Sequence, residues 1–197
     1  MTASSATTAQ PVDAALAASA ATPYAVPIPR NPAAIAAQCK ALLADLKQAE
    51  AQLAQGNEPP GTSVLAALDA MTRRTEDTMG PLDVLVAVSP RKAIRDAAEA
   101  CDRDYQAYSS GFWQNAAVYA RVRQVPPIDD TDRRYWRDTL DNFEDAGVVL
   151  EPDKQQRVRQ LNDELTALTQ TFERRIRETA PGCGSHVTSW PACPLVC

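Results

Sequence analysis

The chain has 197 residues, and 45% of them are hydrophobic, so it is long and apolar enough to bury one core and is not a disordered polar chain. Its net charge of −5 argues against nucleic acid as the main partner, and weakly against an anionic membrane surface, because both favour a basic protein face. The sequence contains no run of about 18 apolar residues, so we expect no transmembrane helix.

The distribution of charge divides the chain into three parts. Residues 1–29 contain one charged residue, Asp13, and residues 179–197 contain none, so we expect residues 30–178 to form the folded unit. Residues 1–29 are predicted to be a disordered leader. Residues 18–20 resemble a signal-peptide cleavage site, but no Lys or Arg precedes them, so at most the leader is a degenerate signal peptide. We expect a cytoplasmic protein by default, and a periplasmic or secreted one if the start codon is misassigned.

Two helices are expected first. Asn31 caps the first helix with Pro32 at its first position, and Gly56 ends it. Its inner face is predicted to hold Ile35, Cys39, Leu42, Leu43, Leu46 and Leu53. The second helix is predicted to turn inward Val64, Leu65, Leu68, Met71, Thr75 and Met79. The Gly80-Pro81 pair is expected to kink or end this helix, and residues 82–88 are predicted to be helical because no second strand is present to pair with them.

A long third helix is predicted to start at Ser89-Pro90 and to run to Pro126-Pro127. It carries apolar residues at alternating steps of three and four. They are Ile94, Ala97, Cys101, Tyr105, Tyr108, Phe112, Asn115, Tyr119 and Val122. A fourth helix is expected after the carboxylates Asp129, Asp130 and Asp132, which we interpret as its negatively charged N-terminus rather than as a metal or general-acid cluster.

The fifth helix is expected to organise the others. Gly147 can close the fourth helix in the left-handed conformation, and Pro152 suits the first turn of the fifth. A row of apolar residues then follows at helical spacing: Val158, Leu161, Leu165, Leu168, Phe172 and Ile176. We expect the remaining helices to pack against this row and the arginines at 174, 175 and 177 to lie on a solvated face. The prediction is an all-α domain of about five long antiparallel helices, followed by an irregular tail.

Three groups of motifs occur in a specific order. The first is Gly80-Pro81-Leu82 followed by Ser89-Pro90 and by Arg95-Asp96-Ala97-Ala98-Glu99-Ala100-Cys101. The second is Asn115-x-x-Val118-Tyr119-Ala120, and the third is Phe143-x-x-x-Gly147-x-x-Leu150 with Leu161, Leu165, Leu168 and Phe172. Together they resemble the N-terminal helical region of the thimet oligopeptidase and oligopeptidase A family of zinc metallopeptidases, over about residues 23–178. Arg175 departs from the Asn that the family has at this point.

The resemblance implies a much longer enzyme that hydrolyses short peptides. In the family, zinc is bound by a His-Glu-x-x-His helix and a further Glu in the C-terminal half, while the N-terminal helices form one wall of a deep channel. This chain has one histidine, His186, followed by Val187, so it does not encode that motif. We therefore expect a protease-family fragment with no catalytic residue and no zinc of its own, which self-associates through apolar surface that the catalytic half would cover.

Four aromatic residues are candidates for the channel wall: Tyr105, Tyr108, Phe112 and Tyr119. At helical spacing such residues are more often part of the core, and we give that interpretation the larger weight. The alternative function is a helical binding or scaffold protein that works without chemistry.

The cysteines allow two interpretations. The tail residues Cys183, His186, Cys193 and Cys197 have a loosely zinc-like spacing. The abrupt change of composition after Glu178 favours read-through sequence after a lost reading frame. Cys39 and Cys101 lie on apolar helix faces and are expected to be buried free thiols, with pairing left open if the chain is exported.

Overall fold

The computed structural model describes residues 28–58, 63–126 and 128–179, and all regular structure in these ranges is helical. The helices are α2 (Pro32–Gln55), α3 (Val64–Val88), α4 (Lys92–Phe112), α5 (Ala116–Arg123), α6 (Asp130–Asp145) and α7 (Pro152–Thr179). The predicted all-α class is confirmed, with six described helices where about five were expected. Most of the predicted leader and nearly all of the predicted tail lie outside the described residues.

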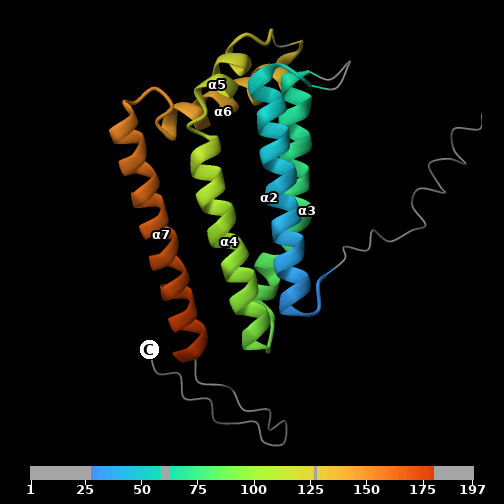
Figure 1. Cartoon of the computed structure of the whole chain (residues 1–197), viewed down its shortest axis with the longest axis vertical. Helices are drawn as coiled ribbons and strands as arrows, with labels where there is room; N and C mark the ends of the chain where they lie inside the picture. Colours follow the sequence, from blue (N-terminus) through green and yellow to red (C-terminus); the bar gives the residue numbers. More distant parts are fainter. Residues whose placement is uncertain (1–27, 59–62, 127, 180–197) are drawn as a thin grey trace, which may run out of the picture.

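The long helices lie side by side, and the two short ones close one end. Figure 1 shows α2, α3 and α4 running up, down and up, α5 and α6 at the end where α4 finishes, and α7 returning beside α4. Among the described helices, α7 packs against α4 alone. The domain is therefore a three-helix unit with a fourth long helix on its flank, rather than a closed bundle.

Local sequence signals set most of the helix ends. The Asn31 side chain accepts a hydrogen bond of 2.8 Å from the Ala34 amide, and Pro32 occupies the first turn of α2. Gly56 ends α2 with a φ of 73°, and Gly147 follows α6 with a φ of 85°, so both take the left-handed conformation that favours glycine. These predicted boundaries, and the start of α7 at Pro152, are confirmed.

The core fills the space between α2, α3 and α4 and extends under α5 and α6. Its members include nearly all residues that the apolar spacing placed inward on the first two helices. Leu82 of α3, Val118 of α5 and Phe143 of α6 are completely buried. Phe143 also packs against the rings of Phe112, Trp113 and Tyr119, which joins the short helices to the end of α4.

Two predicted helix boundaries differ from the structure. Residues 82–88 are helical, as predicted, but they belong to α3, which continues through Pro81 to Val88 and does not end at the Gly80-Pro81 pair. Ser89 is the C-cap of α3, and α4 begins at Lys92.

The predicted third helix is in fact two helices. It breaks after Phe112, where the Asn115 side chain accepts hydrogen bonds of 3.0 and 3.2 Å from the amides of Ala117 and Val118. Asn115 thus caps α5, and the apolar spacing continues across a turn that separates α4 from α5.

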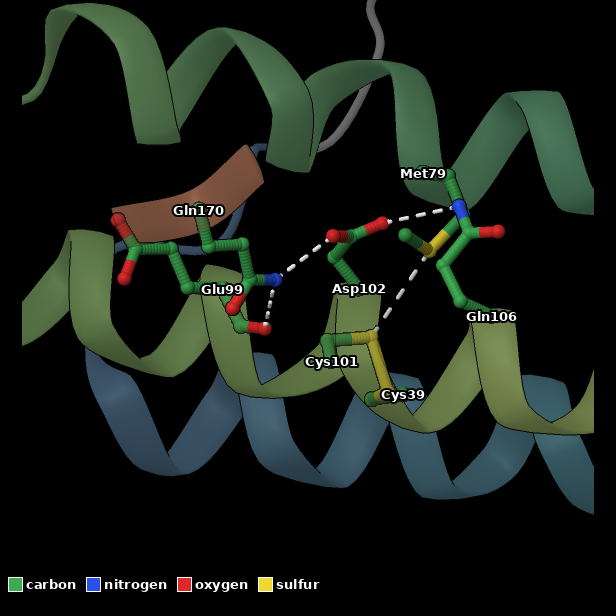
Figure 2. Close-up of a disulfide and its surroundings, with 7 residues drawn as sticks. All are labelled: Cys39, Met79, Glu99, Cys101, Asp102, Gln106 and Gln170. Atoms are coloured by element: carbon green, nitrogen blue, oxygen red, sulfur yellow. Dashed lines mark hydrogen bonds between the residues drawn. A yellow bond between two sulfur atoms is a disulfide. The ribbon is translucent and has the colours of Figure 1, made fainter. Parts of the chain in front are cut away.

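The expectation that Cys39 and Cys101 are free thiols is also wrong. They form a disulfide between α2 and α4, with a Cα–Cα distance of 5.7 Å (Figure 2). Both residues are almost completely buried, and the Met79 Sδ of α3 lies 3.8 Å from the Cys101 Sγ. The bond therefore sits where the three long core helices meet.

Within the described ranges, no helix combines the length and the apolar content that a membrane crossing needs.

Candidate functional site

The apolar row of α7 does not form the centre of the fold, contrary to expectation. Leu165, Leu168 and Phe172 are 62%, 67% and 65% exposed, and Leu161 and Ile176 are about half exposed. The reason is the rotation of α7 about its axis, which turns the polar side chains of Gln170, Arg174 and Arg177 towards α4 instead. We call the five exposed residues the α7 row.

A buried glutamate holds the C-terminal half of α7 against α4. Glu99 of α4 is 2% exposed and accepts hydrogen bonds from Arg174, at 2.5 Å, and from Arg177. These charge-assisted bonds compensate for the cost of burying the carboxylate. The prediction that Arg174 and Arg177 lie on a solvated face is therefore wrong, because both pair with a buried acid of α4.

Gln170 extends this polar contact along α4. Its amide nitrogen donates to the Glu99 carbonyl oxygen at 3.0 Å and to the Asp102 carboxylate at 2.8 Å, and its amide oxygen accepts from Arg103 at 2.8 Å. Figure 2 shows Gln170 reaching Glu99 and Asp102 of α4, and Asp102 directly follows the disulfide residue Cys101. Both N–H groups and the oxygen of the side-chain amide thus have partners on α4, which fixes the register of α7 on α4.

The N-terminal half of α7 is held by a second amide. Gln114, in the turn after α4, donates to the carbonyl oxygens of Ala146 and Gln155 at 2.8 and 3.2 Å, and accepts from Arg159. Gln114 is 7% exposed, so it joins the start of α7 to the core. Both ends of α7 are therefore attached through polar side chains, and its apolar row remains uncovered.

A cleft of about 660 Å³ lies between α3, α4 and α7. Its lining combines apolar residues of the α7 row, Leu165 and Ile176, with the acids Asp83, Asp102 and Glu173 and with the paired Glu99 and Arg177. Partial burial raises the pKa of Asp83, and the nearby Asp102 and Glu173 carboxylates raise it further. The cleft has the mixed lining of a binding site, and its acids favour a positively charged group.

The predicted channel-wall residues occupy two places. Tyr105, Tyr108 and Phe112 line one cavity beside α3 and α6, and Phe112 is 7% exposed. Tyr119 lies apart from them, with its ring 5.8 Å from that of Phe143 and its hydroxyl donating to Glu144 at 2.6 Å. The structure thus brings three of the four residues together, and the fourth, Tyr119, contacts Phe143 and Glu144 of α6 instead.

The acidic run at the start of α6 has the role that we predicted. The Asp129 side chain accepts a hydrogen bond of 2.8 Å from the Asp132 amide and caps α6, and Asp130 pairs with Arg133 at 2.5 Å. In the part of the chain that the structure describes, no three His, Cys, Asp or Glu side chains are grouped to hold a metal ion. The proposed tail ligands, Cys183, His186, Cys193 and Cys197, lie outside the described residues.

The buried Glu99 and its partners were missed by the sequence analysis. The available signal was a polar row on α7, in which Gln170, Arg174 and Arg177 follow at steps of four and three. Such a polar row can face a buried acid on another helix. Glu99 is that acid, and it lies next to the buried Ala98 on α4.

The chemistry of this site has to be inferred from its own residues and from the motifs of the sequence. No protein-family model matches the chain, and no curated protein is significantly similar to it.

Proposed function

We propose that this helical domain is the non-catalytic wall of a zinc metallo-oligopeptidase and takes part in the hydrolysis of short peptides only together with a catalytic half that holds the zinc. The observation that best supports the proposal is the exposure of the α7 row, five large apolar side chains that lie on one face of a folded helix and are open to solvent. The ordered motifs from Gly80 to Phe172 support the assignment, and the alternative is a helical scaffold that needs no second half.

The α7 row is large for an uncovered surface. Burying one Leu or Phe side chain contributes roughly 1.5–3 kcal/mol, so five uncovered side chains leave a large free energy for association. Contiguous apolar patches of this kind mark interaction sites on soluble proteins. The Glu99 and Gln114 contacts hold α7 in place from its other side, so a partner can cover the row without moving the helix.

The cleft beside the row suits a peptide. Its volume of about 660 Å³ falls in the range of ligand sites, and its lining contains both apolar and acidic groups. The acids Asp83, Asp102 and Glu173 suit the ammonium group of a short peptide, and Leu165 and Ile176 suit an apolar side chain.

A peptidase assay tests the absence of catalysis. The purified chain is incubated with a quenched-fluorescent peptide, with and without added zinc. We expect no turnover in either case, and turnover that a chelator abolishes would contradict the proposal.

Size-exclusion chromatography with light scattering separates the proposal from the scaffold alternative. We expect the wild-type chain to self-associate as its concentration rises and Leu168→Glu to remain monomeric, because the new charge interrupts the α7 row. Gln156→Glu adds the same charge to an exposed polar position of α7 and is expected to behave like the wild type. A wild-type chain that stays monomeric at all concentrations favours the scaffold.

The DNA downstream of codon 197 offers an independent test of the family assignment. Translation in all three frames is expected to reveal a His-Glu-x-x-His sequence, since the proposal requires a zinc-binding half. Its absence from the neighbouring sequence would count against the family.

A further inference from the structure

We propose that the α7 row pairs with the α7 row of a second copy of this chain, in an antiparallel arrangement with two-fold symmetry. The inference rests on the proposed function, since the row is open to a second copy only while no catalytic half covers it. It deepens that function by naming the occupant of the row, the direction of the second helix and its register.

The α7 row points away from the rest of its own domain. Leu168 and Phe172 each lie two positions from Gln170, so at about 3.6 residues per turn they project about 160° away from the side chain that contacts α4. Among the described helices, α4 is the one that packs against α7, and Figure 1 shows α7 at the edge of the domain. A second helix can therefore lie along the row without meeting another described helix of the same chain.

The row has the spacing of a coiled-coil seam. Leu161, Leu165, Leu168 and Phe172 follow at steps of four, three and four, which places them at alternating d and a positions of a heptad. Ile176, the fifth member of the row, lies at an e position and flanks the seam. An antiparallel pairing that sets Leu161 opposite Phe172 of the second copy also sets Leu165 opposite Leu168, because both pairs are centred on the same point of the helix. This register buries all four seam residues of both copies.

The residues beside the seam select this direction and register. The g positions of α7 are occupied by Arg157, Glu164, Thr171 and Glu178. In the antiparallel register above, Arg157 lies beside Glu178 of the second copy, and Glu164 lies beside Thr171. A shift of one heptad in either direction brings Glu164 beside a glutamate of the second copy, and a parallel pairing brings no opposite charges together at the g and e positions. Charge complementarity thus favours one arrangement and penalises its neighbours.

Arg157 and Glu178 are placed to form this pair, because both are exposed. Within its own chain, Arg157 makes long contacts, 3.4 Å to the Gln160 Oε1 and 3.8 Å to the Glu164 carboxylate. A carboxylate of the second copy can replace such contacts at little cost. The two-fold axis repeats the pair at both ends of a seam roughly 32 Å long and closes the assembly at two copies.

Sedimentation velocity at increasing concentration of the purified chain measures the association. We expect a monomer that converts to a dimer without larger species, because a two-fold interface leaves neither row open to a third copy. Random association through an apolar surface would instead give a series of larger species.

Reversal of the flanking charges tests the register. Arg157→Glu and Glu178→Arg each place like charges at both ends of the seam, and each is expected to weaken the dimer about tenfold. The double variant Arg157→Glu/Glu178→Arg restores opposite charges and is expected to regain the wild-type affinity. Glu178→Arg is the more informative single variant, because it reduces the net negative charge of the chain, which by itself favours association. Arg137→Glu, on the exposed surface of α6, is the control and is expected to dimerise like the wild type.

Cysteine cross-linking tests the direction of the second helix. In a background with Cys183, Cys193 and Cys197 replaced by Ser, chains with Leu161→Cys are mixed with chains with Phe172→Cys and oxidised. The antiparallel register places these two cysteines opposite each other, within reach of a disulfide. Each variant alone places its two cysteines about 16 Å apart along the helix, so we expect it to cross-link at least about tenfold more slowly than the mixture. Circular dichroism shows whether each variant is folded.

The pairing is overturned if the wild-type chain stays monomeric, if it forms a series of larger species, or if each cysteine variant cross-links alone as fast as the mixture. Association that Leu168→Glu abolishes but that both charge reversals leave unchanged overturns the register and leaves the proposed function in place. Peptide turnover that a chelator abolishes overturns the proposed function and leaves a dimer through α7 in place.

Discussion

Removal of the Cys39–Cys101 disulfide is expected to destabilise the domain strongly. The bond joins residues 62 positions apart and thereby restricts a long loop of the unfolded chain. The loop-closure relation for a loop of this length gives about 4 kcal/mol at 25 °C. Domains have a total stability of about 5–15 kcal/mol, so this one bond accounts for a large part of it.

The assay uses a background in which Cys183, Cys193 and Cys197 are replaced by Ser, so that only the pair of interest remains. Thiol titration of the denatured, air-oxidised protein is expected to find no free thiol. Urea unfolding, followed by circular dichroism, then compares this protein with the same protein after reduction. With a slope of about 2–3 kcal/mol per molar urea, a loss of about 4 kcal/mol lowers the midpoint by about 1.3–2 M.

A second comparison separates the cross-link from the packing of the sulfur atoms. The double variant Cys39→Ala/Cys101→Ala loses both and is expected to be slightly less stable than the reduced protein, because Ala leaves a small void beside Met79. Two free thiols in the oxidised protein, or a midpoint that reduction leaves unchanged, would refute the reasoning. Since disulfides persist in oxidising compartments, the same titration on protein isolated from cells also reports where the chain folds.

Three further substitutions test the polar contacts and the turns. Glu99→Gln leaves Arg174 and Arg177 without a buried counter-charge and is expected to cost about 2–4 kcal/mol in urea unfolding and to speed amide exchange in α7, because breaking a buried ion pair is strongly destabilising. Gly147→Ala is expected to cost about 1–2 kcal/mol, because φ is 85° and the new Cβ would lie 2.7 Å from the Leu150 Cδ1. Asp83→Asn is expected to stabilise the domain at pH 7, by less than about 1 kcal/mol because the side chain is exposed and screened. The pKa of Asp83 is raised in the folded protein above its value of 3.8 in the unfolded chain. Below pH 3.8 the carboxyl group is protonated in both states and costs nothing, and the destabilising charge appears as the pH rises through the pKa of the folded state. The gain should therefore vanish at about pH 3.

Each of these three has its own control. Glu178→Gln removes an exposed charge of α7 and is expected to change stability by less than about 0.5 kcal/mol. Gly111→Ala, in a helix with open space around it, is expected to be neutral or stabilising, in contrast to Gly147→Ala. Asp163→Asn, on the exposed side of α7, is expected to change the stability at pH 7 by less than about 0.5 kcal/mol. If a variant and its control change the stability equally, the physical reason given for that variant is wrong.

Helix ends were predictable where local chemistry decides them. The side chain of Asn31, the ring of Pro32 and the positive φ of Gly56 and Gly147 act within one turn, so their roles can be inferred from neighbouring residues alone. The same logic also explains the missed break at Asn115. Its capping role was visible in principle, but the apolar spacing continues across the turn and favoured one uninterrupted helix.

Contacts between distant segments were not predictable in the same way. Apolar spacing identified the face of α7 correctly, but whether that face is buried depends on which partner lies opposite it. Glu99 and its arginine partners are more than 70 positions apart in the chain, and the two cysteines could only be paired once α2 and α4 were placed side by side. For the candidate site, the sequence therefore indicated which residues form the α7 row, but not that this row faces solvent.

The orientation of α7 has a consequence for any partner that covers its row. The polar contacts that hold the helix, from Gln114 at one end to Glu99 at the other, lie on the side that faces α4. A partner can thus bury the α7 row without breaking these bonds and without ordering a flexible segment. Association then carries little cost for reorganising α7, and the costs that remain are the loss of translational and rotational freedom and the ordering of side chains at the interface. A helix attached through its polar side and exposed on its apolar side is therefore well suited to be one half of a larger interface.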